Sequence, residues 1–330
     1  MTSIRRSSSR GARSSLARRL AVGSASRLGG VLLVVWGAAT AGFIALRLIP
    51  GDPVDVMLGV HARVGEEVRA QIREDWGLDE PPLVQYLSYL GRLLQGDLGQ
   101  SYQLRSSVTD VIGGQALPTV QLTSLALLFA LVLALAAALL ARGPLAQRIV
   151  SLVELLVISS PTFWIGLVLL AVFSFQLGWF PVTASEGFAS LVLPALTLAL
   201  PVAGIISQVL RQGLDDAEAQ QFATTARARG VSRAGLVLRH SFRHAGADSL
   251  TLTGYLVGSL LGGAVLVETV FARQGLGGVA IRAIIGRDIP VVLGIIVVAA
   301  IVFALINLIV DLTYRVLDPR LRVVAHEVAA

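Results

Sequence analysis

Lysine and cysteine are both absent from this sequence of 330 residues. Without cysteine, the chain has no disulfide, no thiolate metal site and no cysteine nucleophile. Without lysine, it has no phosphate-binding loop of the Gly-x-x-x-x-Gly-Lys-Ser/Thr type, in which the lysine contacts the phosphates. If ATP takes part in the function, the sequence predicts that another protein hydrolyses it.

Charged side chains are scarce as well. They make up 15% of the residues, against about 25% in a typical soluble protein, and hydrophobic residues make up 55%. All 27 basic residues are arginine, but they are divided among several loops and form no single basic stripe with interleaved aromatic residues. The composition predicts a membrane protein and no nucleic-acid partner.

The four histidines are dispersed along the chain, at His61, His240, His244 and His326. They form no His-Glu-x-x-His pattern and no other spacing typical of a metal site. No cluster of catalytic side chains stands at either end of the apolar segments. The sequence therefore predicts no catalytic residue, no metal site and no cofactor bound by this chain.

Six apolar stretches are long enough to cross a membrane as helices, which takes about 20 residues for roughly 30 Å of hydrocarbon. The expected spans are 28–50, 118–141, 149–177, 191–210, 250–271 and 289–312. The fourth contains Pro194 and Pro201, so neighbouring helices must compensate for the missing backbone hydrogen bonds. The predicted fold is an all-α membrane protein with about six transmembrane helices.

The first apolar stretch has a second interpretation, because Arg18, Arg19 and Arg27 precede it as in a secretory signal. The apolar run exceeds the roughly 7 to 15 residues of a signal sequence. It also ends at Arg47 and Pro50 without a small-x-small cleavage site. We therefore favour a retained helix.

The distribution of arginine predicts the orientation. With the N-terminus inside, 18 arginines lie in cytoplasmic segments and 8 in outer segments, while Arg47 falls within the first span. The positive-inside rule then puts both termini in the cytoplasm, with tails at 1–27 and 313–330. The Arg/Ser-rich tail is too polar to bury a core and is expected to be disordered through about Ser15. It anchors the topology or binds anionic lipid headgroups.

The outer segment 51–117 is too long for a turn and carries ten acidic residues against five arginines. Val64 to Trp76 is a plausible helix. From Pro81 to Leu94, apolar residues recur at i, i+3, i+4 and i+7, which predicts an amphipathic helix. The segment is expected to fold, either as a cap on the bundle or as a docking surface for a soluble partner outside the membrane.

The cytoplasmic loop 212–248 interrupts the apolar pattern. Asp215 to Arg229 is rich in alanine and in charged or amide residues, which favours a helix. Gly230 is suited to end that helix, and Ser232 can cap a second one from Arg233 to His244. Such a hairpin is either a rigid knob that transmits motion or a solvated connector.

The residues of this loop resemble a known family. Phe222-Ala-Thr-Thr-Ala-Arg-Ala-Arg-Gly230, with Val231-Ser232 and Leu238-Arg239-His240, is similar to the Glu-Ala-Ala loop of ABC importer permeases in the dipeptide, oligopeptide and nickel group. In that family the loop contains the coupling helix, which sits in a groove of the cytoplasmic ATPase. The resemblance implies that the ATPase contacts Thr224, Thr225, Ala226, Arg227, Ala228, Arg229, Gly230 and Val231.

The resemblance covers nearly the whole chain from the first span onward. Further similar motifs are Pro50-Gly51-Asp52-Pro53, Gly77-Leu78-Asp79 with Pro82-Leu83-Val84-Gln85-Tyr86, Gly96-Asp97-Leu98-Gly99-Gln100-Ser101, Pro161-Thr162-Phe163-Trp164 with Gly166, Glu268-Thr269-Val270-Phe271 with Gly275-Leu276-Gly277, Arg287-Asp288-Ile289-Pro290, and Asn307, Asp311, Tyr314 and Leu317-Asp318-Pro319-Arg320. The chain departs from the family where Gln221 replaces a usual acidic residue, where Thr224 replaces a charged one, and at His244 and Ala247-Asp248.

The resemblance implies a type I ABC importer permease fold in the bacterial inner membrane, with a permease core at 118–312. The chain would form half of a pathway for di- or oligopeptides, together with a second permease, two ATP-binding cassette subunits and an external substrate-binding protein. ATP and magnesium would bind the ATPase subunits. Nickel, glutathione, opines and some oligosaccharides are alternative cargoes in this group. An ion-coupled secondary transporter is the more distant alternative.

Ionisable groups at membrane depth are functional candidates because they are costly to bury there. Glu154 lies near the inner start of the third span and is expected to reach the headgroups or to line the pathway. Glu268 ends the fifth span and is expected to organise the Gly-rich turn that follows. Asn307 and Asp311 form an i, i+4 pair suited to hydrogen bonds between helices, with Arg315 as an ion-pair partner for Asp311.

Overall fold

The computed structural model describes residues 29–45, 47–48, 50–58, 65–141, 143–182, 187–220, 225, 228–229 and 242–317. The side chains of 53, 56–57, 217–218, 242–255 and 310–317 are outside this description. The N-terminal tail, residues 318–330 of the C-terminal tail and most of the loop predicted to be cytoplasmic therefore lie outside the described residues.

The described chain is helical apart from one short hairpin. A first helix, Gly29–Ala45, precedes α2 (Pro53–Leu58), α3 (Glu66–Trp76), α4 (Pro82–Leu94), β1 (Gln100–Ser101), β2 (Ser106–Ser107), α5 (Val108–Leu140), α6 (Gly143–Ser159), α7 (Thr162–Leu169), a π-helix η1 (Leu170–Gln176), α8 (Ala189–Ala219), α11 (Phe242–Val270), α12 (Leu276–Gly286) and α13 (Ile289–Leu317). The strands pair antiparallel, with Gln100 opposite Ser107.

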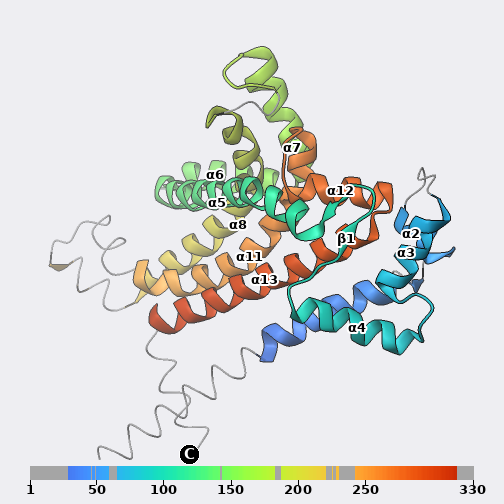
Figure 1. Ribbon diagram of the computed structural model, residues 1–330. Helices are drawn as coiled ribbons and strands as arrows, with labels where there is room; N and C mark the ends of the chain where they lie inside the picture. Colours follow the sequence, from blue (N-terminus) through green and yellow to red (C-terminus); the bar gives the residue numbers. More distant parts are fainter. Residues whose placement is uncertain are drawn as a thin grey trace, which may run out of the picture.

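Three of the described helices, α5, α8 and α13, are long and apolar enough to cross a membrane. A fourth span results if α6 and the helix formed by α7 and η1 count together. Shorter apolar helices lie at Gly29–Ala45, Leu256–Val270 and Leu276–Gly286. In Figure 1, α8, α11 and α13 run side by side, and α12 lies across the end of this layer.

The third predicted span differs from the expected single run 149–177. The chain bends by 110° between α6 and α7, at Ser160 and Pro161. Proline has no backbone N–H, and its ring disfavours helical geometry in the residue before it. The single apolar run is therefore two helices that meet at a corner.

The second predicted span, 118–141, starts ten residues too late. α5 begins at Val108, where the Ser107 hydroxyl accepts the backbone N–H of Asp110 as an N-terminal cap. Pro118 lies inside this helix without ending it. Along α5, Ala126, Ala130 and Ala134 recur every fourth residue and are buried against α8. Such small residues let two helix backbones approach closely within a membrane.

Both helices predicted for the outer segment are confirmed as α3 and α4. Together with α2 and the hairpin they form a unit at 50–107 that we call the cap. A hydrophobic cluster joins it to the first helix and to α13, and consists of Ala39, Val54, Leu58, Ile72, Tyr89, Ile289, Leu293 and Val297. Two polar contacts add to this junction, because Arg47 donates to Gln85 at 2.5 Å and Thr40 bonds the Tyr86 hydroxyl at 2.7 Å.

Candidate functional site

The predicted ATPase contacts lie mostly outside the described residues. Of these contacts, the structure describes Thr225, Ala228 and Arg229, and the Arg229 N–H donates to the Thr225 carbonyl at 3.2 Å. This bond joins residues four positions apart, which is the spacing of one turn of α-helix. Thr224, Ala226, Arg227, Gly230 and Val231 lie outside the described part of the chain, so their role stays a prediction.

The helix that leads to this loop is longer than expected. The fourth span was predicted to end at residue 210, yet α8 continues to Ala219 without a break. The predicted start of a separate loop helix at Asp215 therefore lies within α8. Nothing between 210 and 215 stops the helix, because neither glycine at a left-handed position nor proline occurs there. The residues that lead into the predicted coupling loop, up to Ala219, thus belong to a helix that is long and apolar enough to cross a membrane.

Glu154 is buried, with 3% of its surface exposed, and pairs with Arg211. The Arg211 guanidinium donates to Glu154 Oε2 from Nη2 and to Ser151 Oγ from Nη1, the latter at 3.3 Å. The pair joins α6 to α8 eight residues before α8 ends. This burial differs from the expectation that Glu154 reaches the headgroups. The sequence did not indicate Arg211 as its partner, because the two residues are 57 positions apart.

Glu268, at the end of α11, is fully buried and organises the turn that follows it, as predicted. Its Oε2 accepts the backbone N–H groups of Gly277 at 2.8 Å and Gly278 at 3.3 Å. Its Oε1 accepts the Thr119 hydroxyl at 2.6 Å, and Thr119 Oγ1 in turn accepts the Leu276 N–H at 2.9 Å. These are N–H groups of the first turn of α12, which have no partner within that helix.

Glycine is required where this turn meets α11. A Cβ added to Gly277 would lie 2.3 Å from the Val265 Cα, and one added to Gly275 would lie 2.2 Å from the Glu268 carboxyl carbon. Real Cβ atoms do not approach that closely, so the two helices contact each other through backbone. The sequence motif Gly275-Leu276-Gly277 is explained by this approach. Thr119 was missed because it comes from α5, 149 residues away from Glu268.

A second polar cluster links the cap to the corner between α12 and α13. The Ser101 hydroxyl donates to the Asp288 carboxylate, whose other oxygen lies 3.5 Å from the Val291 N–H. Gln103 Nε2 donates to the Gly286 carbonyl at 2.8 Å. Burial raises the pKa of Asp288, while the bonds from Ser101 and Val291 partly offset this increase.

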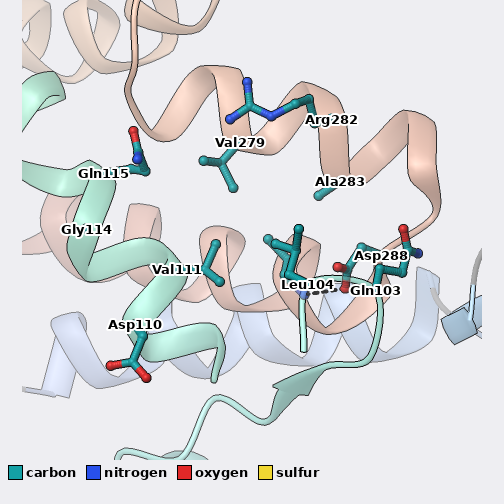
Figure 2. A pocket seen from close by; sticks show the side chains of 11 residues that line it. Gln103, Leu104, Asp110, Val111, Gly114, Gln115, Val279, Arg282, Ala283 and Asp288 are labelled. Atoms are coloured by element: carbon teal, nitrogen blue, oxygen red, sulfur yellow. Dashed lines mark hydrogen bonds between the residues drawn. The ribbon is translucent and has the colours of Figure 1, made fainter. Parts of the chain in front are cut away.

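Beside this cluster lies a hollow of about 420 Å³, which we call the corner hollow (Figure 2). It is bounded by the hairpin, the first turns of α5, α12 and the start of α13. The lining residues are Gln103, Leu104, Asp110, Val111, Gly114, Gln115, Val279, Arg282, Ala283, Asp288 and Val291. Its floor is apolar, and its charged groups are Asp110 of α5, Arg282 of α12 and Asp288 between α12 and α13. No pattern in the sequence indicated this hollow, because no motif joins these segments.

The remaining candidate, Asn307, is half-buried and donates to the Phe303 carbonyl at 2.8 Å within its own helix. The side chains of Asp311 and Arg315 lie outside the described residues, so the predicted pairs among these three stay predictions. Within the described ranges, no group of three or more histidine, aspartate or glutamate side chains is placed to hold a metal ion.

Comparisons with known proteins agree with the helical architecture. Residues 98–323 match the family described as "Binding-protein-dependent transport system inner membrane component". The glutathione transport system permease protein GsiC of Escherichia coli O6:H1 is 34% identical over 299 residues, which covers 90% of this chain and 97% of that protein. GsiC of Salmonella typhimurium is also 34% identical, with the same coverage.

A chain of the MetNI methionine ABC transporter, in an inward-facing conformation, has a similar fold. The match has a TM-score of 0.52 at 19% sequence identity and covers 61% of this chain and 93% of that one. The family match spans about two thirds of the chain, and the relatives match almost end to end. The chain therefore belongs to the binding-protein-dependent transport system inner membrane components, the permease subunits of ABC importers.

Proposed function

We propose that this permease carries short peptides, with glutathione, itself a tripeptide, among the candidate cargoes. The observation that carries the proposal is the end-to-end similarity to GsiC, at 34% identity over 97% of that protein's length. The motifs of the dipeptide, oligopeptide and nickel group support the same substrate class. Nickel and other small solutes are the alternatives, because the external binding protein selects most of the cargo in this group.

The membrane arrangement we propose has six spans and both termini in the cytoplasm. α5, α8 and α13 supply three spans, the bent pair of α6 with α7 and η1 supplies one, and the first helix and α11 supply two. The excess of arginine in the segments counted as inner supports this orientation. The cap then faces the outside, where a substrate-binding protein can reach it.

The partners we propose are a second permease, two ATP-binding cassette subunits and the external binding protein. The coupling helix would be Thr224–Val231, at the end of α8. The continuity of α8 to Ala219 supports this, because force on the loop acts directly on a membrane helix. The Glu154–Arg211 ion pair connects the C-terminal part of α8 to α6.

The experiment is purification of the tagged chain in mild detergent, with identification of the proteins that come with it and an ATPase assay on the eluate. We expect a second permease, ATPase subunits and vanadate-sensitive hydrolysis that rises when the binding protein and a peptide are added. A single chain without ATPase activity, reproducible across detergents, would instead favour the ion-coupled secondary transporter. In that case, transport would collapse with the proton gradient.

Substitution at the loop tests the coupling helix within the same preparation. In Gly230→Val, the β-branched side chain opposes a helix end in the left-handed conformation, so we expect peptide-stimulated ATP hydrolysis and transport to be lost together. Gly91→Val in α4 is the matched control, since a side chain there meets no atom within 4 Å. Transport that survives Gly230→Val would count against the loop assignment.

A further inference from the structure

We propose that the corner hollow is a binding site for the free carboxyl end of a short peptide, with Arg282 as the residue that recognises the carboxylate. The inference rests on the proposed function, because it assumes a peptide cargo. It assigns a specific contact on this chain, in addition to the selection made by the external binding protein.

The first argument is that the cation of the hollow is unpaired. The structure gives Arg282 no ion pair and no side-chain hydrogen bond within the described residues. Its guanidinium runs back along α12 and lies over Val279, with Nη1 3.3 Å from the position of a Cβ added to Gly278 (Figure 2). A larger residue at position 278 would crowd it. The glycine therefore leaves the five N–H donors of the guanidinium free at the edge of the hollow.

The second argument is that each of the two acids of the hollow accepts a serine hydroxyl instead of the arginine. Asp110 accepts the Ser107 hydroxyl at 2.6 Å, and Asp288 accepts the Ser101 hydroxyl. Neither acid forms an ion pair with Arg282. The positive charge is thus available to a ligand, and a carboxylate is the group that matches the planar fork of arginine through two parallel hydrogen bonds.

The third argument is that the hollow contains a hydrogen-bond acceptor that has no donor. Gln115 Oε1 lines the hollow, is buried and has no hydrogen-bond partner in the described structure. Buried polar atoms are almost always hydrogen-bonded, so this oxygen can accept a hydrogen bond from a donor on a ligand. A peptide end offers both complements at once, because the residue that carries the terminal carboxylate also carries the amide N–H of the last peptide bond.

The size and floor of the hollow fit the same ligand. Its volume of about 420 Å³ lies within the range of roughly 300 to 1,000 Å³ that is typical of small-molecule sites. An apolar wall that can accept an aliphatic side chain is formed by Val111, Val279, Ala283 and Val291. The site would therefore favour a short peptide that ends in an apolar residue.

The test uses the assembled importer in lipid nanodiscs without its external binding protein. Equilibrium binding is measured for radiolabelled glycyl-leucine and for its C-terminal amide. We expect the free acid to bind more tightly than the amide. Arg282→Gln should weaken binding of the free acid about tenfold and leave the amide unchanged, because only the free acid loses a charge-assisted pair. Arg282→Lys keeps the charge without the fork and should lie between the two.

Two further variants make the result specific. Gln115→Leu should weaken the acid and the amide alike, since both carry the N–H. Arg105→Gln removes an exposed arginine from the neighbouring turn, outside the hollow, and should change neither. An effect of Arg105→Gln as large as that of Arg282→Gln would reduce the result to general electrostatic attraction and overturn the proposal.

The inference is also overturned if neither form binds at millimolar concentration or if Arg282→Gln affects both forms equally. It fails as well if the variant weakens only the docking of the external binding protein, irrespective of cargo, because Arg282 would then belong to a protein interface. ATPase stimulation by the binding protein is measured in the same nanodiscs. Its absence in the wild type refutes the proposed function, whereas intact stimulation without carboxylate discrimination refutes this inference alone.

Discussion

Glu268 and Gly277 are joined by a hydrogen bond of 2.8 Å, from the backbone N–H of Gly277 to Oε2 of Glu268. The bond crosses the corner at which α11 ends and α12 begins. It is possible only because Gly277 has no Cβ, which would meet the backbone of Val265. The carboxylate and the glycine therefore depend on each other.

Removal of the carboxylate should destabilise the protein. Glu268→Ala leaves the Thr119 hydroxyl and two backbone N–H groups of α12 without their acceptor in a buried site. We expect a loss of about 3 kcal/mol in the free energy of unfolding, because each unsatisfied buried donor costs about 1 to 3 kcal/mol. Thermal unfolding in detergent measures the effect. Glu67→Gln, at an exposed position of α3, is the control, and equal stability of both variants would contradict the role of Glu268 as the acceptor for these donors.

Two glycine-to-alanine substitutions should have opposite effects. Gly277→Ala would force its methyl group to within 2.3 Å of the Val265 Cα, so the corner must open and stability should fall by more than about 2 kcal/mol. In Gly113→Ala the methyl group meets nothing within 4 Å, and the helix should gain up to about 1 kcal/mol. The melting temperatures should therefore lie on opposite sides of the wild-type value. A loss in both variants would show that helix propensity does not govern position 113.

Stability should fall as the pH rises through the titration of Asp288. Burial raises the pKa of this group above its ordinary value of 3.8, so the folded protein binds the proton more tightly than the unfolded chain. The contribution to stability is therefore greatest below pH 3.8 and is lost as the pH rises through the folded-state pKa. Asp288→Asn should flatten this dependence, as measured by melting temperature between pH 4 and 7. Asp79→Asn, which changes an exposed carboxyl group on the cap, is the control.

The Glu154–Arg211 pair should show strong coupling in a double-mutant cycle. Arg211→Leu leaves the buried charge of Glu154 unpaired and should cost about 3 to 5 kcal/mol, whereas Glu154→Leu leaves a partly exposed arginine and should cost less. The double variant removes both charges, and we expect it to be more stable than either single variant. Unfolding of all four proteins in detergent gives the coupling energy. Additive losses would indicate that the two side chains do not depend on each other.

Periodicity and turn chemistry were sufficient to predict the local elements. The period of apolar residues predicted α4, and the position of Glu268 before a glycine-rich turn predicted its role. Contacts between distant segments were not predictable, because a single sequence contains no record of which segments meet. The roles of Thr119 and Arg211 arise only because α5 packs beside α11 and α8 packs beside α6. The corner hollow could not be predicted for the same reason, because four segments that are distant in the sequence form it.

The boundaries of the spans were predicted less well than their existence. Hydropathy marks where lipid can surround a helix, and it does not mark where hydrogen bonding stops. α5 begins ten residues before its apolar stretch because Ser107 caps it, and α8 passes its predicted end because nothing breaks it. At Pro161 the error is of another kind, because one apolar stretch is divided there into two helices with a bend of 110° between them.

The uninterrupted course of α8 has a mechanical consequence. Its 31 residues extend over roughly 46 Å at about 1.5 Å per residue. Ala195, Ala199 and Ala203 belong to the same buried cluster as the alanines of α5, and they lie in the half of α8 that is nearer to Ala189. A close contact of this kind fixes a distance but permits tilt, so the alanines form a fulcrum with unequal arms. A push on the end at Ala219 would therefore swing the long arm widely and move the short arm at Ala189 by less, in the opposite direction.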